Sequence, residues 1–126
     1  MNYFWVALGS AVGGMGRYAV SGLGVRFVSE TFPWGTLAVN VLGSLIIGAL
    51  AVILPVDTRL LTEAERELLM VGLCGGFTTF SSFSLEVMNL ARNGDWTAAS
   101  AYAVGSVVVC LAAVAIGYFG TLALAR

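Results

Sequence analysis

The sequence predicts an all-α membrane protein with four transmembrane helices, because it is strongly apolar and its few charges are clustered. Hydrophobic residues make up 59% of the 126 positions and charged residues only 10%, whereas soluble domains carry about 25% charged residues. The charges leave uncharged stretches near the ~20 residues that a membrane-spanning helix requires. The strict alternation of membrane β-strands is not seen. We therefore expect one helical membrane domain over residues 1–126, with no soluble domain attached.

Four spans are expected in chain order, at about residues 4–24, 36–54, 68–91 and 97–124. The first is interpreted as an uncleaved helix, since it lacks the positively charged start of a signal peptide. Pro33 and Pro55 flank the second span and separate it from its neighbours.

Capping residues mark the starts of the third and fourth helices. Thr62, followed three residues later by Glu65, forms the pattern of a capping box and predicts a helix start near residue 63. Residues 92–95, with the sequence Arg-Asn-Gly-Asp, predict a tight turn, and Asp95 can cap the fourth helix.

The arginines give almost no preferred orientation in the membrane. The chain has no Lys, and four helices place both termini on one side. The two sides carry nearly equal numbers of Arg: Arg59, Arg66 and Arg126 against Arg26 and Arg92, with Arg17 nearby. Such a near tie leaves two readings open under the positive-inside rule. Either other factors orient a single topology, or the chain inserts both ways and forms an antiparallel homodimer.

Composition also excludes several classes of function. A net charge of −1 lacks the basic surplus that nucleic-acid binding requires. With no His and two Cys, a His/Cys metal site has almost no ligands. Neither a His or Lys base nor paired carboxylates are present, so we expect no enzyme activity. Cys74 and Cys110 are interpreted as free thiols packed as small hydrophobic side chains.

Polar side chains inside the expected spans are costly, which makes them candidates for function. Arg17 either snorkels to an interface, attracts anions to a vestibule or pairs with an acid. Asn40, with Thr36 one turn before it, either bonds a neighbouring helix or contacts a ligand. Glu86 could pair with Arg17 or Arg92, cap a water-filled vestibule, or carry protons.

The strongest signal lies in residues 72–84. The pair Gly75-Gly76 weakens a helix by about 1 kcal/mol per glycine, and five of the seven residues 78–84 bear hydroxyls. One interpretation is a packed stripe of Phe77, Phe80 and Phe83, with hydroxyls bonded to carbonyls one turn back. The other is a broken helix that lines a cavity. Freed carbonyls suit a small cation, but hydroxyls, amide N–H groups and the positive edges of Phe rings favour a small anion.

These segments resemble the Fluc (CrcB) fluoride channels. The resemblance is carried by residues 75–84 (GGFTTFSSFS), 33–36 (PWGT) with Asn40, and Gly13-Gly14 with Arg17, and it covers essentially the whole chain. It implies a dual-topology, antiparallel homodimer in the bacterial cytoplasmic (inner) membrane. Such a dimer has two pores, lies in membrane lipid and exports fluoride passively from the cytoplasm.

The resemblance also implies which residues line each pore. Phe80 and Phe83 would turn their ring edges toward fluoride, and Asn40 would be the pore amide. The other pore residues would be hydroxyl-bearing side chains, namely Thr36, Ser81, Ser82, Tyr102 and Ser106. Cys110 stands where a further hydroxyl can occur and is not counted in the pore, because a thiol is a weaker donor.

Outside the pore, the resemblance implies a structural sodium ion and a vestibule. The backbone carbonyls of Gly75 and Thr78 would bind Na⁺ at the centre of the dimer. Arg17 and Glu86 would lie near the vestibule.

Two other functions remain open. A small multidrug-type proton-coupled exporter is also a four-helix, dual-topology dimer, but it needs an acid near the middle of its first helix, and none precedes Arg17 here. A non-conducting packing subunit would explain the glycines but not the cluster of Phe and hydroxyl residues.

Overall fold

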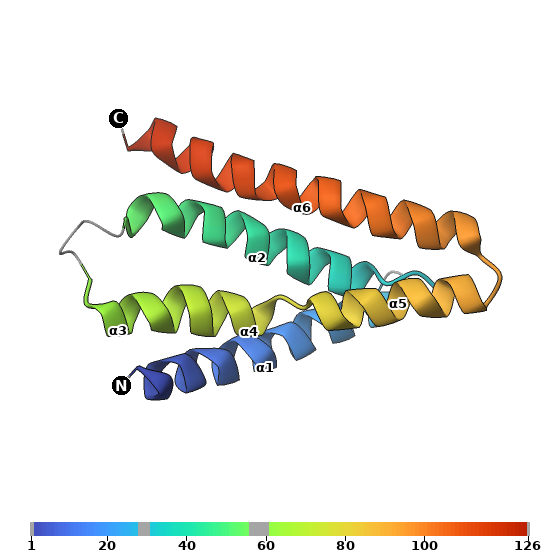
Figure 1. The fold of residues 1–126 in the computed structure, drawn as a ribbon, viewed down its shortest axis with the longest axis horizontal. Coiled ribbons are helices and arrows are strands. Elements are labelled where there is room, and N and C mark those ends of the chain that lie inside the picture. The colour runs from blue at the N-terminus through green and yellow to red at the C-terminus, as the bar shows by residue number, and fades with distance from the viewer. Residues whose placement is uncertain (1, 28–30, 56–60, 126) are drawn as a thin grey trace.

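Long helices lie side by side in a computed structural model that describes residues 2–27, 31–55 and 61–125 (Figure 1). They are α1 (Tyr3–Phe27), α2 (Trp34–Ile53), a composite third helix within residues 63–92, and α6 (Trp96–Leu124). Helix α2 packs along α6, and α1 packs along the third helix. No strand occurs in the described ranges, so the prediction of an all-helical chain is confirmed.

The third helix is divided into several pieces. A single turn, α3 (Glu63–Arg66), continues into the π-helix η1 (Glu67–Cys74) and then into α4 (Gly75–Phe77). The backbone is extended at Thr78 (φ −80°, ψ 159°) and Thr79 (φ −152°, ψ 116°). A new helix, α5 (Phe80–Arg92), begins directly afterwards. The predicted break in the third helix is therefore present, two residues beyond the glycine pair.

The predicted caps are confirmed. The Oγ1 of Thr62 accepts from the Glu65 N–H, and the Glu65 carboxylate accepts from the Thr62 N–H at 2.9 Å, which completes the capping box. The Asp95 carboxylate accepts from the Ala98 N–H at 2.9 Å and caps α6. Gly94 permits the preceding turn because its φ is +85°.

Within the described residues, three helices are long and apolar enough to cross a membrane: Trp34–Ile53, Glu63–Arg92 and Trp96–Leu124. Helix α1 has 25 residues, but Arg17, Arg26 and several glycines lower its hydropathy, and composition alone does not qualify it as a fourth span. The two ends of the chain lie at the same end of the bundle (Figure 1). Two of the arginines weighed for orientation, Arg59 and Arg126, lie outside the described residues.

Close helix packing depends on glycines. A Cβ added at Gly48 would overlap the Val114 carbonyl oxygen, and one at Gly117 would overlap the Leu45 carbonyl oxygen. Helices α2 and α6 therefore approach backbone to backbone at Gly48 and Gly117. The spacing of small residues in these helices serves packing within one chain.

Gly72 and Gly76, before the break, have the same role. A Cβ on Gly76 would lie 2.8 Å from the Ser10 Cα, and one on Gly72 would lie 2.9 Å from the Gly9 Cα. Gly76 remains helical, so its function is to admit α1. Gly75, by contrast, has no atom within 4 Å of an added Cβ, and the break lies beyond both glycines, at Thr78 and Thr79.

Gly117→Ala is expected to lower the free energy of unfolding in detergent by about 1–3 kcal/mol, because the new methyl group forces α2 and α6 apart. Thermal denaturation measures the change. The matched control is Gly120→Ala in the same helix, where an added Cβ meets no atom within 4 Å. Equal stabilities of the two variants would contradict the packing assigned to Gly117.

Candidate functional site

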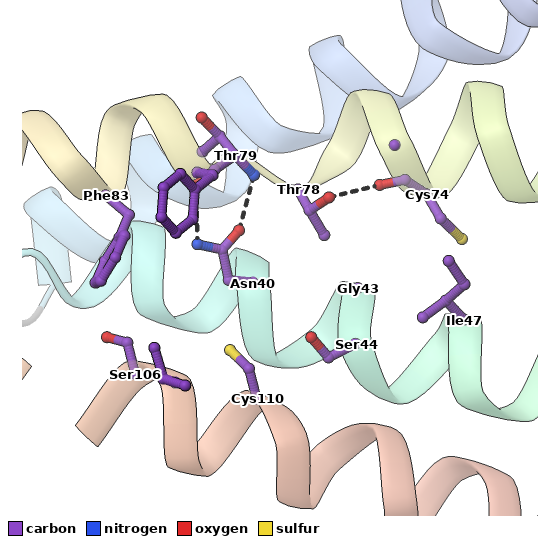
Figure 2. A pocket seen from close by; sticks show the side chains of 13 residues that line it. Asn40, Gly43, Ser44, Ile47, Cys74, Thr78, Thr79, Phe83, Ser106 and Cys110 are labelled. Carbon is purple, nitrogen blue, oxygen red and sulfur yellow. Dashed lines mark hydrogen bonds between the residues drawn. The ribbon is translucent and has the colours of Figure 1, made fainter. Parts of the chain in front are cut away.

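Asn40 holds the break in the third helix through two hydrogen bonds. Its Nδ2 donates to the Thr79 carbonyl at 3.0 Å, and its Oδ1 accepts from the Thr79 N–H at 2.8 Å (Figure 2). One amide side chain therefore satisfies both backbone groups of an extended residue. Without these bonds, the two groups would be unpaired in an apolar bundle, where each unpaired group is expensive.

Thr79 also starts the helix that follows. Its Oγ1 accepts from the Ser82 N–H at 3.2 Å, as an N-cap does. The same oxygen lies 3.1 Å from the Ser82 Oγ and 3.3 Å from the Ser81 Oγ. Three hydroxyls thus gather at the first turn of α5, and two of them, on Ser81 and Ser82, were expected in the pore.

The other two hydroxyls of the run bond to the backbone one turn back. Thr78 Oγ1 donates to the Cys74 carbonyl at 3.0 Å, and Ser84 Oγ donates to the Phe80 carbonyl at 2.9 Å. Both contacts fit the simple packing interpretation of the run. That interpretation does not cover Thr79 and its neighbours.

In a continuous helix, the carbonyls of Gly75 and Thr78 would each accept a hydrogen bond from a backbone N–H four residues later, and the break removes both bonds. The Thr79 N–H would donate to Gly75 and the Ser82 N–H to Thr78, but they donate to Asn40 and to the Thr79 hydroxyl instead. Carbonyl oxygens without a helical donor are suitable ligands for a small hard cation. The chemistry of this donor pair fits the sodium site that the resemblance implies.

A cavity of about 310 Å³ lies between α2, the broken helix and α6 (Figure 2). Six of the expected site residues line it, namely Asn40, Gly75, Thr78, Phe80, Phe83 and Ser106. The rest of its wall consists of Gly43, Ser44, Ile47, Cys74, Thr79, Val107 and Cys110. None of these described lining residues is charged.

Ser106 contributes a buried, unpaired polar group to this wall. The residue is only 5% exposed, and its Oγ has no hydrogen-bond partner among the described residues. Figure 2 shows Ser106 and Cys110 projecting from α6 toward α2. A buried hydroxyl without a partner costs about 1–3 kcal/mol. The site therefore favours an occupant that accepts a hydrogen bond from Ser106.

The two expected Phe rings differ in their surroundings. Their centroids are 5.4 Å apart with an interplanar angle of 50°. Phe83 is buried, whereas Phe80 is 75% exposed although it lines the cavity. Phe80 therefore leaves one side of the cavity wall open.

Glu86 lies in a second polar cluster beside Phe83. Thr36 Oγ1 donates to Glu86 Oε1 at 2.6 Å, and the Tyr102 hydroxyl donates to Glu86 Oε2 at 2.8 Å. The rings of Tyr102 and Phe83 meet edge to face, with centroids 5.2 Å apart. Among the described residues, both carboxylate oxygens are held by hydroxyls rather than by Arg17 or Arg92.

The structure therefore divides the expected site residues into groups. Thr36, Tyr102 and Glu86 form the second cluster, and Ser81 and Ser82 join the cavity through Thr79. Arg17 lies on α1, in neither group.

Seven lining residues were not among the expected site residues, and three of them, Thr79, Ser44 and Cys110, were within reach of the sequence pattern. Thr79 belongs to the hydroxyl run 78–84, directly before Phe80, so its place beside an expected pore residue could have pointed to it. Ser44 and Cys110 stand four residues after Asn40 and Ser106, on the same helix faces. Helical spacing alone could have placed both in the wall of this cavity, and the exclusion of Cys110 from the pore stays a prediction.

Membrane-length helices surround a largely apolar cavity at a helix break, with the Asn40 amide and the Ser106 hydroxyl in its wall, an arrangement that suits a membrane transport protein. Comparison with known families supports this class: the family model described as "CrcB-like protein, Camphor Resistance (CrcB)" matches residues 4–118. The chain belongs to the CrcB-like family.

Several curated relatives carry a common name. A protein of Opitutus terrae is 51% identical over 123 residues, covering 97% of this chain and 93% of its own length. One of Paramagnetospirillum magneticum is 51% identical over 119 residues, with 94% and 93% covered. One of Rhodospirillum rubrum is 46% identical over 121 residues, with 95% and 94% covered. Each is named "Fluoride-specific ion channel FluC".

Two predictions are confirmed by these comparisons together with the fold. The family is one of ion channels, so the chain is not an enzyme. Family membership and the apolar helices make it a multi-pass protein of the bacterial inner membrane.

Asn40→Asp is expected to lower the free energy of unfolding by about 1–3 kcal/mol, because a carboxylate cannot donate to the Thr79 carbonyl. Denaturation in detergent measures the loss, and amide hydrogen exchange at Thr79 and Phe80 locates it. Asn89→Asp, at an exposed position on α5, is the matched control, with an expected change within about 0.5 kcal/mol. Unchanged exchange at Thr79 in Asn40→Asp would refute the proposed role of the amide.

Proposed function

We propose that this chain is a fluoride-selective passive channel that exports fluoride from the cytoplasm. The observation that carries the proposal is the unpaired, buried Ser106 hydroxyl in an uncharged cavity that Asn40 and Phe83 also line. The names of the relatives supply the identity of the ion.

The cavity chemistry suits a small, strongly hydrated anion. Entry requires several donors in place of water, and exit requires that no single contact hold the ion too firmly. Ser106 and Ser44 offer hydroxyl donors, and the edges of Phe80 and Phe83 carry partial positive charge. Neutral donors in series meet both requirements better than one buried Arg would.

The second cluster continues this route. Tyr102 lies one turn before Ser106 on α6, and its ring contacts Phe83. An ion leaving the cavity past Phe83 would meet the hydroxyls of Tyr102 and Thr36, which Glu86 otherwise engages. Glu86 thus serves as a vestibule group that competes with the anion for these donors, and Arg17 serves as an attracting charge outside the cavity.

The working unit in this proposal is an antiparallel homodimer with two pores. The exposed Phe80 leaves the cavity wall incomplete in one chain, so a second copy would close it. The near tie of Arg on the two sides agrees with insertion in both directions. The carbonyls of Gly75 and Thr78 would hold a structural Na⁺, which supplies fixed positive charge at the centre of the dimer.

Purified protein in liposomes loaded with fluoride and chloride should release fluoride rapidly and retain chloride, without a pH gradient. Ion-selective electrodes measure both anions. Absence of fluoride flux would refute the channel. Flux that requires protons would favour the exporter class instead.

Ser106→Ala is expected to reduce fluoride efflux about tenfold or more, since loss of one donor removes about 1–3 kcal/mol of interaction. Stability should not fall, because Ala removes an unpaired hydroxyl at nearly the same volume. The matched control is Ser100→Ala, at an exposed position on the same helix. Wild-type flux in Ser106→Ala would remove the hydroxyl from the route.

Phe80→Ile should also abolish most of the fluoride efflux while leaving the dimer intact, because an aliphatic side chain has no positive ring edge. Phe119→Ile, at an exposed position on α6, is its control. Equal efflux from both variants would contradict a role for the Phe80 ring.

A reporter fused to the C-terminus tests dual topology. It should report from both sides of the membrane, and a signal from one side alone would contradict dual insertion.

A further inference from the structure

Aromatic rings meet one another where α2 begins. Phe32 contacts Tyr102 edge to face, with centroids 5.3 Å apart and planes at 75°. Trp34 contacts Phe32 in turn, with centroids 4.7 Å apart. Tyr102 is 2% exposed and also contacts Phe83 of the cavity wall, with centroids 5.2 Å apart. A chain of ring contacts therefore joins the start of α2 to the cavity.

The backbone around Pro33 fixes the position of Phe32. Pro33 has φ −80° and ψ 59°, which is the geometry of an inverse γ-turn. The Trp34 N–H donates to the Phe32 carbonyl at 2.8 Å across this turn, and the proline ring restricts φ to this region before folding. A Cβ on Gly35 would lie 2.6 Å from the Ser21 carbonyl oxygen of α1. Because the chain after the turn lies directly against α1, the backbone of Phe32 has little freedom to move.

The same short segment, residues 32–36, serves both hydroxyls that donate to Glu86. Thr36 belongs to the segment and donates directly, at 2.6 Å. Tyr102 lies on α6 and donates at 2.8 Å, and its ring packs against Phe32. An edge-to-face contact restrains a ring in one orientation, and a hydroxyl already held in place costs no further ordering when a ligand arrives. The Phe32 ring thus keeps the Tyr102 oxygen within reach of Glu86.

We propose that Phe32 is a positioning residue of the anion route, and that it holds the Tyr102 ring so that the hydroxyl stays where a passing anion meets it. Phe32 acts through Tyr102 and not by contact with the anion. The contact stands on the ring geometry alone, whereas its effect on flux rests on the proposed channel function.

NMR of the protein in detergent, with ¹³C in the tyrosine rings, tests the contact without reference to flux. The Tyr102→Phe variant identifies the Tyr102 signal. Phe32→Leu should shift and broaden that signal because Leu has no ring to pack edge to face, and Phe32→Tyr should keep the signal near its wild-type position. The matched control, Phe119→Leu, removes a similar contact with Tyr118 (5.3 Å, 81°) and should shift the Tyr118 signal alone. An unchanged Tyr102 signal in Phe32→Leu would overturn the contact.

Fluoride efflux from liposomes tests the positioning role. Phe32→Leu should lower efflux about two- to tenfold, the range that corresponds to loss of one ring contact, and Phe32→Tyr should retain most of the wild-type efflux. Phe119→Leu, the same control as before, should leave efflux unchanged. Wild-type efflux in Phe32→Leu would overturn the role.

A double-mutant cycle separates positioning from a general structural effect. In the Tyr102→Phe background, Phe32→Leu should cause no further loss of efflux, since the hydroxyl that Phe32 positions is already gone. An equal fold-loss in both backgrounds would overturn the role, because Phe32 would then act independently of Tyr102. Absent efflux from the wild-type protein would count against the channel and the positioning role together, whereas the NMR result would still decide the contact.

Discussion

The pair of hydrogen bonds between Asn40 and the backbone of Thr79 is the constraint on which the rest of the site depends. Because one amide satisfies both the N–H and the C=O of Thr79, the third helix can end and restart inside an apolar bundle. The restart lets the Thr79 hydroxyl cap α5 and directs Phe83 into the cavity. The same interruption deprives the Gly75 carbonyl of its helical donor. A cavity wall, a hydroxyl cluster and a candidate cation site thus follow from one side chain.

Glycine packing provides the complementary constraint. Helix α2 meets α6 through Gly48 and Gly117 with no room for a Cβ, and a Cβ on Gly43 would overlap the Thr78 side chain. Such contacts hold the helices close on either side of the cavity and exclude other arrangements of α2. The opening at Ser106 is therefore bounded by tightly packed backbone. Its size depends on a few glycines as much as on the side chains that line it.

Local features of this fold were predictable from the sequence, and long-range ones were not. The capping box at Thr62 and the Asp95 cap depend on residues within three positions, so pattern alone located them. The partners of Glu86 could not be chosen from the sequence, because Thr36, whose hydroxyl donates to its carboxylate, lies 50 residues away in the chain. The break was expected at the glycine pair, but it lies two residues beyond, where an amide 39 residues earlier in the chain pairs with the Thr79 backbone. Only tertiary packing reveals such causes.

The separation between Asn40 and Thr79 also implies an order of events during biogenesis. Helix α2 is synthesised before residue 79, but the two must lie side by side before the amide can reach the backbone. An extended Thr79 facing lipid would leave its N–H and C=O unpaired, which favours insertion of the nascent segment as a continuous helix. In that order of events the break forms when the bundle assembles. The shape of the mature third helix accordingly depends in part on a residue of α2. A change at residue 40 would straighten the third helix around Thr79, although the sequence of that helix is unchanged.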